Sequence, residues 1–273
     1  MSGWLEAPVP PLRIGLAGWL RVIWRGTLLG SLTYGGLVLL LLVRLVEWPI
    51  FGQARPVTPF ITQFVCRTGL RILRLPLVIH GRPMTAPGAI VANHSSWLDI
   101  FTLNAAQRVY FVAKSEVAGW PAIGWLARAT GTVFIARKGT EARRQKETFE
   151  ARLQAGHRLL FFPEGTSTDA IRVLPFKSTL FEAFFAPGLV RVMHIQPVTV
   201  VFHAPEGQDA RHYGWWGDMD FASHLLKTLA SARQGRVEVT FHHEVPVDAF
   251  ENRKVLAQHC ERVIRTAHVN AVA

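Results

Sequence analysis

The longest uncharged apolar stretch of the chain lies near its amino terminus. From Gly26 to Val43 the sequence runs for 18 residues without a charged side chain, which is just enough for a helix to cross the hydrocarbon core of a bilayer. Arginines stand on both sides of this stretch, so the positive-inside rule gives no clear orientation. The pattern predicts a membrane-associated helix.

A second apolar stretch, Val57 to Leu75, carries three arginines. Arg67, Arg71 and Arg74 are spaced i, i+4 and i+7, so on a helix they share one face. A basic amphipathic helix lies in the membrane interface with its cations among lipid phosphates. The two stretches are predicted to form a helical pair that dips into one leaflet or anchors it to the other, and the cationic ends favour the dip. A single span followed by a soluble linker helix is the alternative.

From about residue 86 onward the pattern changes to short apolar runs separated by helical periodicity. The runs cover 89–92, 108–113, 132–136, 158–162, 194–202 and 236–242, and the helical stretches include 140–154, 219–232 and 248–268. Strands that alternate with helices predict an α/β fold, with a mostly parallel or mixed sheet covered by helices and preceded by the N-terminal membrane-associated helix pair. We expect a membrane-anchoring segment over residues 1–80 and an α/β domain over residues 81–273.

Composition narrows the class of partner. The chain has 30 Lys and Arg against 19 Asp and Glu, a net charge of +11, yet 49% of its residues are hydrophobic and only 18% are charged. A nucleic-acid binder of this charge would be more polar, so the combination indicates an anionic membrane surface and no nucleic acid. No metal is predicted, because Cys66 and Cys260 lack metal-site spacing and Pro246 breaks any helix that His242-His243-Glu244 would need.

The first candidate site follows the apolar run 89–92. His94 stands just after this predicted strand and Asp99 comes five residues later, so the two side chains meet only if a turn separates them. Ser96 as a helix N-cap would supply the turn and put Asp99 at the third helical position. Asp99 would then orient the imidazole and leave its other nitrogen free as a general base. The same residues also fit a capping box with a purely structural role.

The second candidate site is the loop that follows the apolar run 158–162. Gly165 allows a positive φ, and the N–H groups and hydroxyls of Thr166 and Ser167 can cradle an anion. Glu164 would pair with a base or bind a substrate hydroxyl. Arg137, at the end of another apolar run, can hold a phosphate with two hydrogen bonds. Taken singly, these features also fit an ordinary strand-to-turn junction and a solvated surface cation.

The sequence has no evident nucleophile of its own. It contains neither a G-x-S-x-G elbow nor a cysteine beside a histidine in a catalytic arrangement. A His–Asp pair without a nucleophile fits a reaction in which the hydroxyl of a substrate attacks, and acyl transfer to an alcohol is such a reaction. A thioesterase or lipase that uses water and a non-catalytic lipid-binding protein are the rival functions.

Taken together and in order, these segments resemble the 1-acylglycerol-3-phosphate O-acyltransferase, or lysophospholipid acyltransferase, family. That family carries His-x4-Asp, then G-x-x-F-I-x-R, then F-P-E-G-T-R/S, then a late apolar segment that contains proline. Here the four motifs read His94 to Asp99, Gly131 to Arg137, Phe162 to Ser167, and Ile195 to Val198. The resemblance covers roughly residues 70–205.

The resemblance implies a role for each site residue. His94 is the catalytic base and Asp99 its orienting partner, and the residues expected to bind the acceptor are Arg137, Glu164, Gly165, Thr166 and Ser167. The acyl donor is acyl-CoA or acyl carrier protein, with no further cofactor and no metal. The expected acceptor is 1-acyl-sn-glycerol-3-phosphate, which would give phosphatidic acid, and the expected location is the cytoplasmic face of the bacterial inner membrane.

Two positions depart from the family pattern. Ala136 stands where many members have Asp, and Ser167 stands where many have Arg. Loss of that arginine weakens the case for strict phosphate recognition. Relatives that acylate lyso-ornithine lipid, whose head group carries a carboxylate and an amine, resemble this chain also over residues 213–220. Lyso-ornithine lipid is therefore the alternative acceptor, and an enzyme that uses both acceptors is the third reading.

Overall fold

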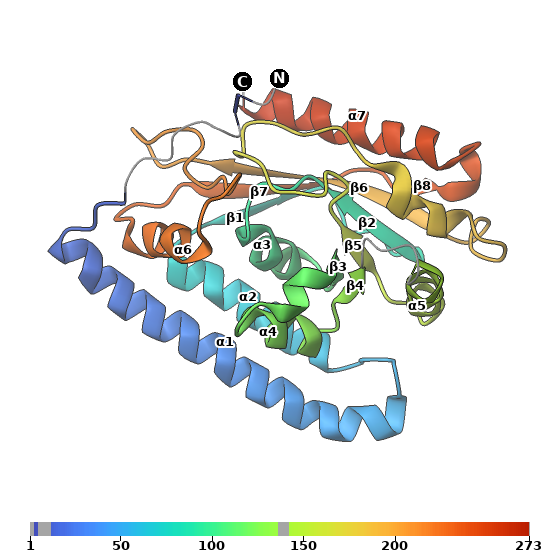
Figure 1. Ribbon diagram of the computed structural model, residues 1–273, viewed down its shortest axis with the longest axis horizontal. Coiled ribbons are helices and arrows are strands. Elements are labelled where there is room, and N and C mark those ends of the chain that lie inside the picture. The colour runs from blue at the N-terminus through green and yellow to red at the C-terminus, as the bar shows by residue number, and fades with distance from the viewer. Residues whose placement is uncertain (1–2, 5–11, 136–141, 273) are drawn as a thin grey trace.

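A mixed β-sheet forms the centre of the molecule (Figure 1). The structure is a computed structural model, and it describes residues 3–4, 12–135 and 142–272. The strand order is β1-β7-β6-β2-β5-β3-β4, with β8 paired to β6. β2 to β6 run parallel to one another, and β7 is antiparallel to β6. The strands are β1 (Leu77–His80), β2 (Gly88–Ala92), β3 (Tyr110–Lys114), β4 (Val133–Ile135), β5 (Leu159–Phe161), β6 (His194–His203), β7 (Arg236–Phe241) and β8 (Val245–Pro246). The predicted α/β fold with a mixed sheet is confirmed.

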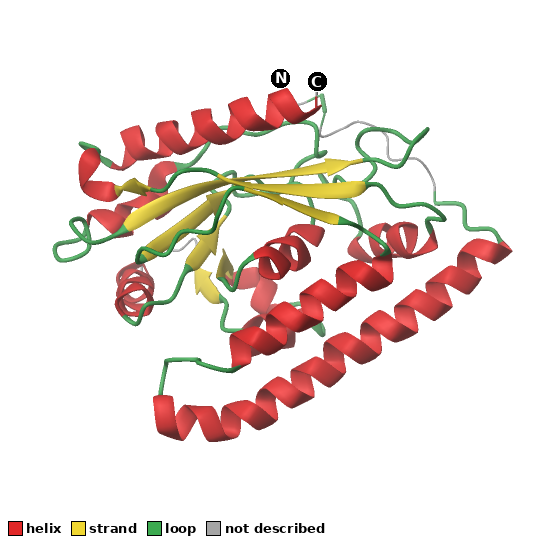
Figure 2. Cartoon of the chain, turned by 180° about the vertical axis from the view of Figure 1, so that it is seen from behind, coloured by secondary structure: helices red, strands yellow, loops and turns green. Residues whose placement is uncertain are grey.

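Helices cover both faces of the sheet. α7 lies on one face, while α2, α3 and α6 lie on the other, with α1 outside them (Figures 1 and 2). The α-helices are α1 (Leu16–Phe51), α2 (Thr58–Leu73), α3 (Leu98–Ala106), α4 (Ile123–Ala129), α5 (Ala142–Gln154), α6 (Phe221–Ala230) and α7 (Arg253–Val272). The 3₁₀ helices are η1 (Ser115–Gly119), η3 (Ser178–Phe185) and η4 (Val247–Ala249).

The central strands are apolar throughout because both of their faces are buried. In β2, Ile90 and Ala92 join the core beneath α2, α3 and α6, whereas Ala89 and Val91 join the core shared with α5 and α7. Successive side chains of a strand point to opposite faces, so one short run of small and branched residues supplies both cores. This burial holds the carboxyl end of β2 at a defined place, and the first candidate site begins there.

The first helix is longer than the uncharged stretch predicted it to be. α1 spans 36 residues and continues through Arg21 and Arg25 on one side and Arg44 on the other. Each of these arginines has a hydrogen-bond partner outside the uncharged stretch. Arg21 and Arg25 donate to the carbonyl oxygens of residues 229–231 at 2.7–2.9 Å, at the carboxyl end of α6, where cations are favoured. Arg44 pairs with Glu47 at 3.1 Å.

The predicted helical pair is present, and its second helix packs against the rest of the protein; whether α1 dips into the membrane or spans it stays a prediction. α2 packs between α1 and α3 (Figure 2), and the Glu47 carboxylate accepts hydrogen bonds from the backbone N–H groups of Val57 and Thr58, which ties the end of α1 to the start of α2. Within the described residues, α1 is the one helix long and apolar enough to cross a membrane by length and composition. Its outer face exposes large apolar side chains, among them Trp19, Leu20, Ile23, Trp24, Val38, Leu39, Leu42 and Leu45.

The division between a membrane segment and an α/β domain at residue 80 stays a prediction. β1 precedes that division, yet it pairs in parallel with β7, from Leu77 opposite Val237 to His80 opposite Thr240. The sheet therefore begins at Leu77.

Candidate active site

The side chain of Asn93 ends β2 and sets the direction of the loop that follows. Its amide donates to the carbonyl oxygen of Val200 at 2.8 Å and accepts from the N–H of the same residue at 2.8 Å. The side chain thus continues the ladder between β2 and β6 by one step, while the backbone is free to turn away from the sheet. His94 comes next, at the carboxyl edge of the parallel strands, where sites in α/β folds gather.

His94 and Asp99 meet in the structure. The Nδ1 atom of His94 lies 2.7 Å from Oδ2 of Asp99, and the Asp99 side chain is fully buried while the imidazole is 19% exposed. The ring also stacks on Phe162, with centroids 4.1 Å apart. With Nδ1 on the carboxylate, Nε2 is the nitrogen available for a substrate proton. The pairing expected from the sequence is therefore present.

The turn between the two residues differs from the expected one. α3 begins at Leu98, its N-cap is Trp97 with no side-chain cap, and Asp99 is the second helical residue. The expected N-cap role of Ser96 is wrong. Instead Asp99 reaches back, and its Oδ2 accepts the backbone N–H groups of Ser95 at 2.8 Å and Ser96 at 3.0 Å. One carboxylate thus accepts two backbone N–H groups of the turn that precedes the helix and orients the imidazole as well.

Glu164 holds the loop of His94 rather than projecting into open space. It lies just beyond the end of β5, the parallel neighbour of β2, and is only 2% exposed. Its two oxygens accept the backbone N–H of His94 at 2.7 Å and of Leu174 at 2.6 Å. Burial raises the pKa of this carboxyl group to about 8, against the lowering effect of the two donors. Glu164 is placed to position the base.

The raised pKa of Glu164 predicts a pH-dependent stability. The folded state keeps this proton up to about pH 8, whereas the unfolded chain loses it near its ordinary value of 4.5, so the free energy of unfolding should fall as the pH rises between these values. The slope approaches about 1.4 kcal/mol per pH unit within this window. Thermal melts from pH 5 to 9 should show this fall in the wild type and a flatter profile in Glu164→Gln. Parallel profiles for the two proteins would contradict it.

The rest of the second loop forms a tight turn. Gly165 adopts a φ of +75°, and a Cβ there would lie 2.9 Å from Nζ of Lys177. Lys177 is exposed and its N–H donates to the carbonyl of Pro163 at 2.9 Å, so an ammonium group is held beside the loop. Thr166 is exposed at the tip. Sequence reasoning did not assign a role to Lys177, although its segment belongs to the resemblance.

Trp215 joins the two loops. Its backbone N–H is shared between the carbonyl oxygens of Ser95 at 3.0 Å and Thr168 at 3.1 Å, and its own carbonyl accepts the hydroxyl of Ser167 at 2.5 Å. The hydroxyl of Ser167 is thus engaged by the backbone of Trp215, at the position where the family resemblance led us to expect arginine. Thr168 in turn donates its N–H to the carbonyl of His94 at 3.0 Å. The resemblance over residues 213–220 did not predict this contact, because no local sequence pattern reports it.

The contact at Trp215 requires glycine before it. A Cβ on Gly214 would lie 2.5–2.7 Å from backbone atoms of Asp169, which cannot move without shifting the second loop. Gly214→Ala should therefore lower the free energy of unfolding by about 1–3 kcal/mol and reduce turnover. Gly119→Ala, where a Cβ meets nothing within 4 Å, is the matched control in a thermal melt and a rate assay. Equal melting temperatures for the two variants would argue against the close contact.

Arg137 lies outside the described residues. β4 ends at Ile135 and runs parallel to β3, so the chain leaves the described part at the same edge of the sheet that carries His94 and Glu164. Its role in binding an acceptor stays a prediction.

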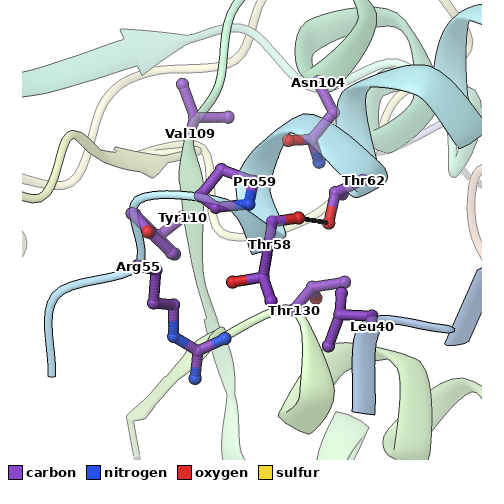
Figure 3. A pocket seen from close by; sticks show the side chains of 9 residues that line it. All are labelled: Leu40, Arg55, Thr58, Pro59, Thr62, Asn104, Val109, Tyr110 and Thr130. Atoms are coloured by element: carbon purple, nitrogen blue, oxygen red, sulfur yellow. Dashed lines mark hydrogen bonds between the residues drawn. The ribbon is translucent and has the colours of Figure 1, made fainter. Parts of the chain in front are cut away.

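A small cavity near the loop between α1 and α2 is not the site. Its volume is about 10 Å³, enough for about one water molecule, and Tyr110 in its wall begins β3, so it lies at the opposite edge of the sheet from His94. Figure 3 shows its lining, which consists of Leu40, Arg55, Thr58, Pro59, Thr62, Asn104, Val109, Tyr110 and Thr130.

Known proteins share both the sequence and the fold. A family model described as Acyltransferase matches residues 77–201, and the lyso-ornithine lipid O-acyltransferase of Rhodobacter capsulatus is 56% identical over 264 residues, 96% of each chain. The chain belongs to the acyltransferase family. This acyltransferase acts on lysolipids and is associated with the membrane. The 1-acyl-sn-glycerol-3-phosphate acyltransferase of Neisseria gonorrhoeae is 39% identical over 103 residues, 36% of this chain and 39% of that one.

A solved structure shares the fold of this acyltransferase. The crystal structure of the 1-acyl-sn-glycerophosphate acyltransferase from Thermotoga maritima matches 94% of this chain and 96% of its own, with a TM-score of 0.65 and 20% sequence identity. At this identity the likeness concerns the arrangement of helices and strands, including the helical pair before the sheet.

Proposed function

We propose that this acyltransferase moves a fatty acyl group from a thioester to the free hydroxyl of lyso-ornithine lipid. The observation that carries the proposal is the 56% identity over 96% of both chains with a lyso-ornithine lipid O-acyltransferase, whereas the Neisseria enzyme for 1-acyl-sn-glycerol-3-phosphate matches only 36% of the chain. This reverses the order of the two acceptors expected from the motifs.

The second loop supports the same acceptor. A phosphate acceptor favours a loop rich in cations, but position 167 carries a serine whose hydroxyl is bound to Trp215. Among the described residues, the cation that lies beside Gly165 is Lys177, and its ammonium group can pair with the carboxylate of an amino-acid head group. Thr166 at the exposed tip adds a hydroxyl that can pair with the same head group.

The proposed chemistry needs one base and no nucleophile from the protein. Nε2 of His94 takes the proton of the acceptor hydroxyl as its oxygen attacks the thioester carbonyl carbon. The tetrahedral intermediate collapses, the carbon–sulfur bond breaks, and the thiolate leaves with the proton from His94. Asp99 stabilises the imidazolium between the two steps. The donor in this proposal is acyl-CoA or acyl carrier protein, and no cofactor or metal takes part.

The helical pair fits an approach to the acceptor from one leaflet. Near its start α1 is tied to α6 by Arg21 and Arg25, and near its end it is tied to the start of α2 by Glu47. In this arrangement it lies along the protein with its apolar face outward. We place the enzyme on the cytoplasmic face of the inner membrane, where thioester carriers are available.

The test is a direct comparison of acceptors. Purified enzyme in mixed micelles receives labelled acyl-CoA or acyl carrier protein with lyso-ornithine lipid or with 1-acyl-sn-glycerol-3-phosphate. We expect the higher kcat/KM with lyso-ornithine lipid. A higher value with the phosphate acceptor would restore the second candidate, formation of phosphatidic acid, which the shared motif order and the Thermotoga fold favour. Fatty acid released without any acceptor would indicate a thioesterase instead.

Lys177 provides a sharper test of the head-group contact. A charged hydrogen bond contributes about 1.5–3 kcal/mol, so Lys177→Met should raise KM for lyso-ornithine lipid by about 10- to 100-fold and change kcat little. Lys254→Met removes another exposed lysine, on α7, and should leave both constants unchanged. Steady-state kinetics over a range of acceptor concentrations separates the outcomes, and an unchanged KM in Lys177→Met would exclude the contact.

A further inference from the structure

A second concave site, separate from the catalytic loops, lies on α2. It is a groove of about 490 Å³ between α2, the end of α3 and the start of β1, and Arg67, Arg71 and Arg74 form its polar side. Its apolar lining consists of Leu70, Leu75, Pro76, Leu77 and Ala105. A volume of this size is in the range of small-ligand sites, and no lining residue belongs to the loops that carry His94 and Glu164.

The backbone at the end of α2 gives the groove its two sides. Arg74 ends the helix in the left-handed conformation, and the N–H of Leu75 donates to the carbonyl of Leu70 at 2.9 Å. This bond closes the last turn as a Schellman motif and redirects the chain. Leu75 and Leu77, which follow this turn, add apolar surface to the lining of the groove.

The arginines of the groove lack an acidic partner. All three are exposed, and none forms a salt bridge with any described residue; Arg67 donates instead to the carbonyl oxygen of Ala105 at 2.8 Å. Arg25 of α1 is close enough to Arg74 for their charges to repel each other. Cations gathered in this way, without a counterion from the protein, create a positive potential that an external anion relieves.

We propose that this groove binds an anionic phospholipid of the membrane, distinct from the acceptor. The arginines match the phosphate, since a guanidinium group holds a phosphate with two parallel hydrogen bonds. The leucines and the proline match the first methylene groups of an acyl chain, which a soluble anion would lack. The groove also lies next to the helical pair whose outer face is apolar, so lipid is the ligand at hand.

The groove reaches the edge of the sheet that carries His94, so a lipid bound in it would affect how the active site meets the membrane. Leu77 pairs with Val237, which lies opposite Phe202 near the end of β6. β6 runs parallel to β2, so the end of the groove formed by Leu77 lies at the same edge of the sheet as His94. An anionic lipid held there keeps the catalytic edge at the surface from which the lysolipid enters.

The test measures lipid binding rather than acyl transfer. The full chain in a neutral detergent is titrated with fluorescent phosphatidylglycerol, with phosphatidylcholine as the uncharged comparison. Arg71→Gln/Arg74→Gln keeps Arg67 and its bond to α3, and should bind phosphatidylglycerol about 25-fold more weakly, at roughly fivefold per arginine. Arg233→Gln/Arg262→Gln removes the same charge from exposed arginines elsewhere and should bind like the wild type.

The controls separate a lipid site from other outcomes. Binding by the wild type should weaken from 50 to 500 mM NaCl on the scale of about tenfold or more, as expected for screened charges, and inorganic phosphate should not displace the lipid. Equal affinity of the Arg71/Arg74 variant and the wild type would overturn the proposal, and so would displacement by phosphate. If the double variant does not fold, Arg71→Gln alone should still show the fivefold loss. Turnover of the Arg71/Arg74 variant at saturating acceptor in detergent should stay within about twofold of the wild-type value. Failure of the lipid-binding proposal can therefore be distinguished from failure of the proposed acceptor.

Discussion

His94→Ala should abolish nearly all acyl transfer while the protein stays folded. The variant loses the group that takes the proton of the acceptor hydroxyl, and a positioned general base contributes about 10²- to 10⁴-fold to a rate. Folding should survive because the imidazole is partly exposed and the backbone of residue 94 keeps its bonds to Glu164 and Thr168. Loss of the stacking on Phe162 should cost about 1 kcal/mol.

The measurement is the initial rate of ester formation from a labelled thioester at saturating acceptor, beside a thermal melt. His243→Ala is the matched control, since His243 is an exposed histidine on the loop after β7; it should retain the wild-type rate. Turnover of His94→Ala within tenfold of the wild type would remove the base from the mechanism, because no described side chain occupies an equivalent place beside Asp99.

Asp99→Asn should have the second largest effect on the rate of acyl transfer, although the two side chains have nearly the same shape. The carboxylate accepts hydrogen bonds from His94, Ser95 and Ser96 on a single oxygen. If the amide nitrogen takes this position, a donor faces three donors. If the amide oxygen takes it, the charge that stabilises the imidazolium is lost. We expect kcat to fall by about 10²- to 10⁴-fold, with KM for the acceptor little changed.

Asp99→Asn should also lower the stability of the protein. Buried N–H groups left with a weaker acceptor should lower the free energy of unfolding by about 1–3 kcal/mol, so kinetics are measured well below the melting temperature of the variant. Asp248→Asn, at an exposed aspartate, should change neither quantity. If Asp99→Asn raised KM and left kcat intact, Asp99 would act on acceptor binding rather than on the base.

Much of the fold follows from local pattern. The strand near residues 89–92 and the long strand near 194–202 appear as β2 and β6 almost where the apolar runs predicted them, because strands buried on both faces must be apolar at every position. The extent of α1 was not predictable in this way. Its arginines look like helix boundaries in the sequence, yet Arg21 and Arg25 find their partners more than 200 residues away on α6.

At the candidate site, too, some features follow from the sequence and others only from the tertiary structure. The sequence by itself determined the residue types and their order: a histidine and an aspartate separated by a turn, a glycine loop after a strand, and no nucleophile. Which groups meet was decided by the tertiary structure alone. The pairing of β2 with β5 brings Glu164 to the backbone of His94 across 70 positions, and the segment before α6 brings Trp215 to both loops. Sequence patterns report neighbours along a helix or strand, whereas these contacts depend on the order in which distant strands assemble into one sheet.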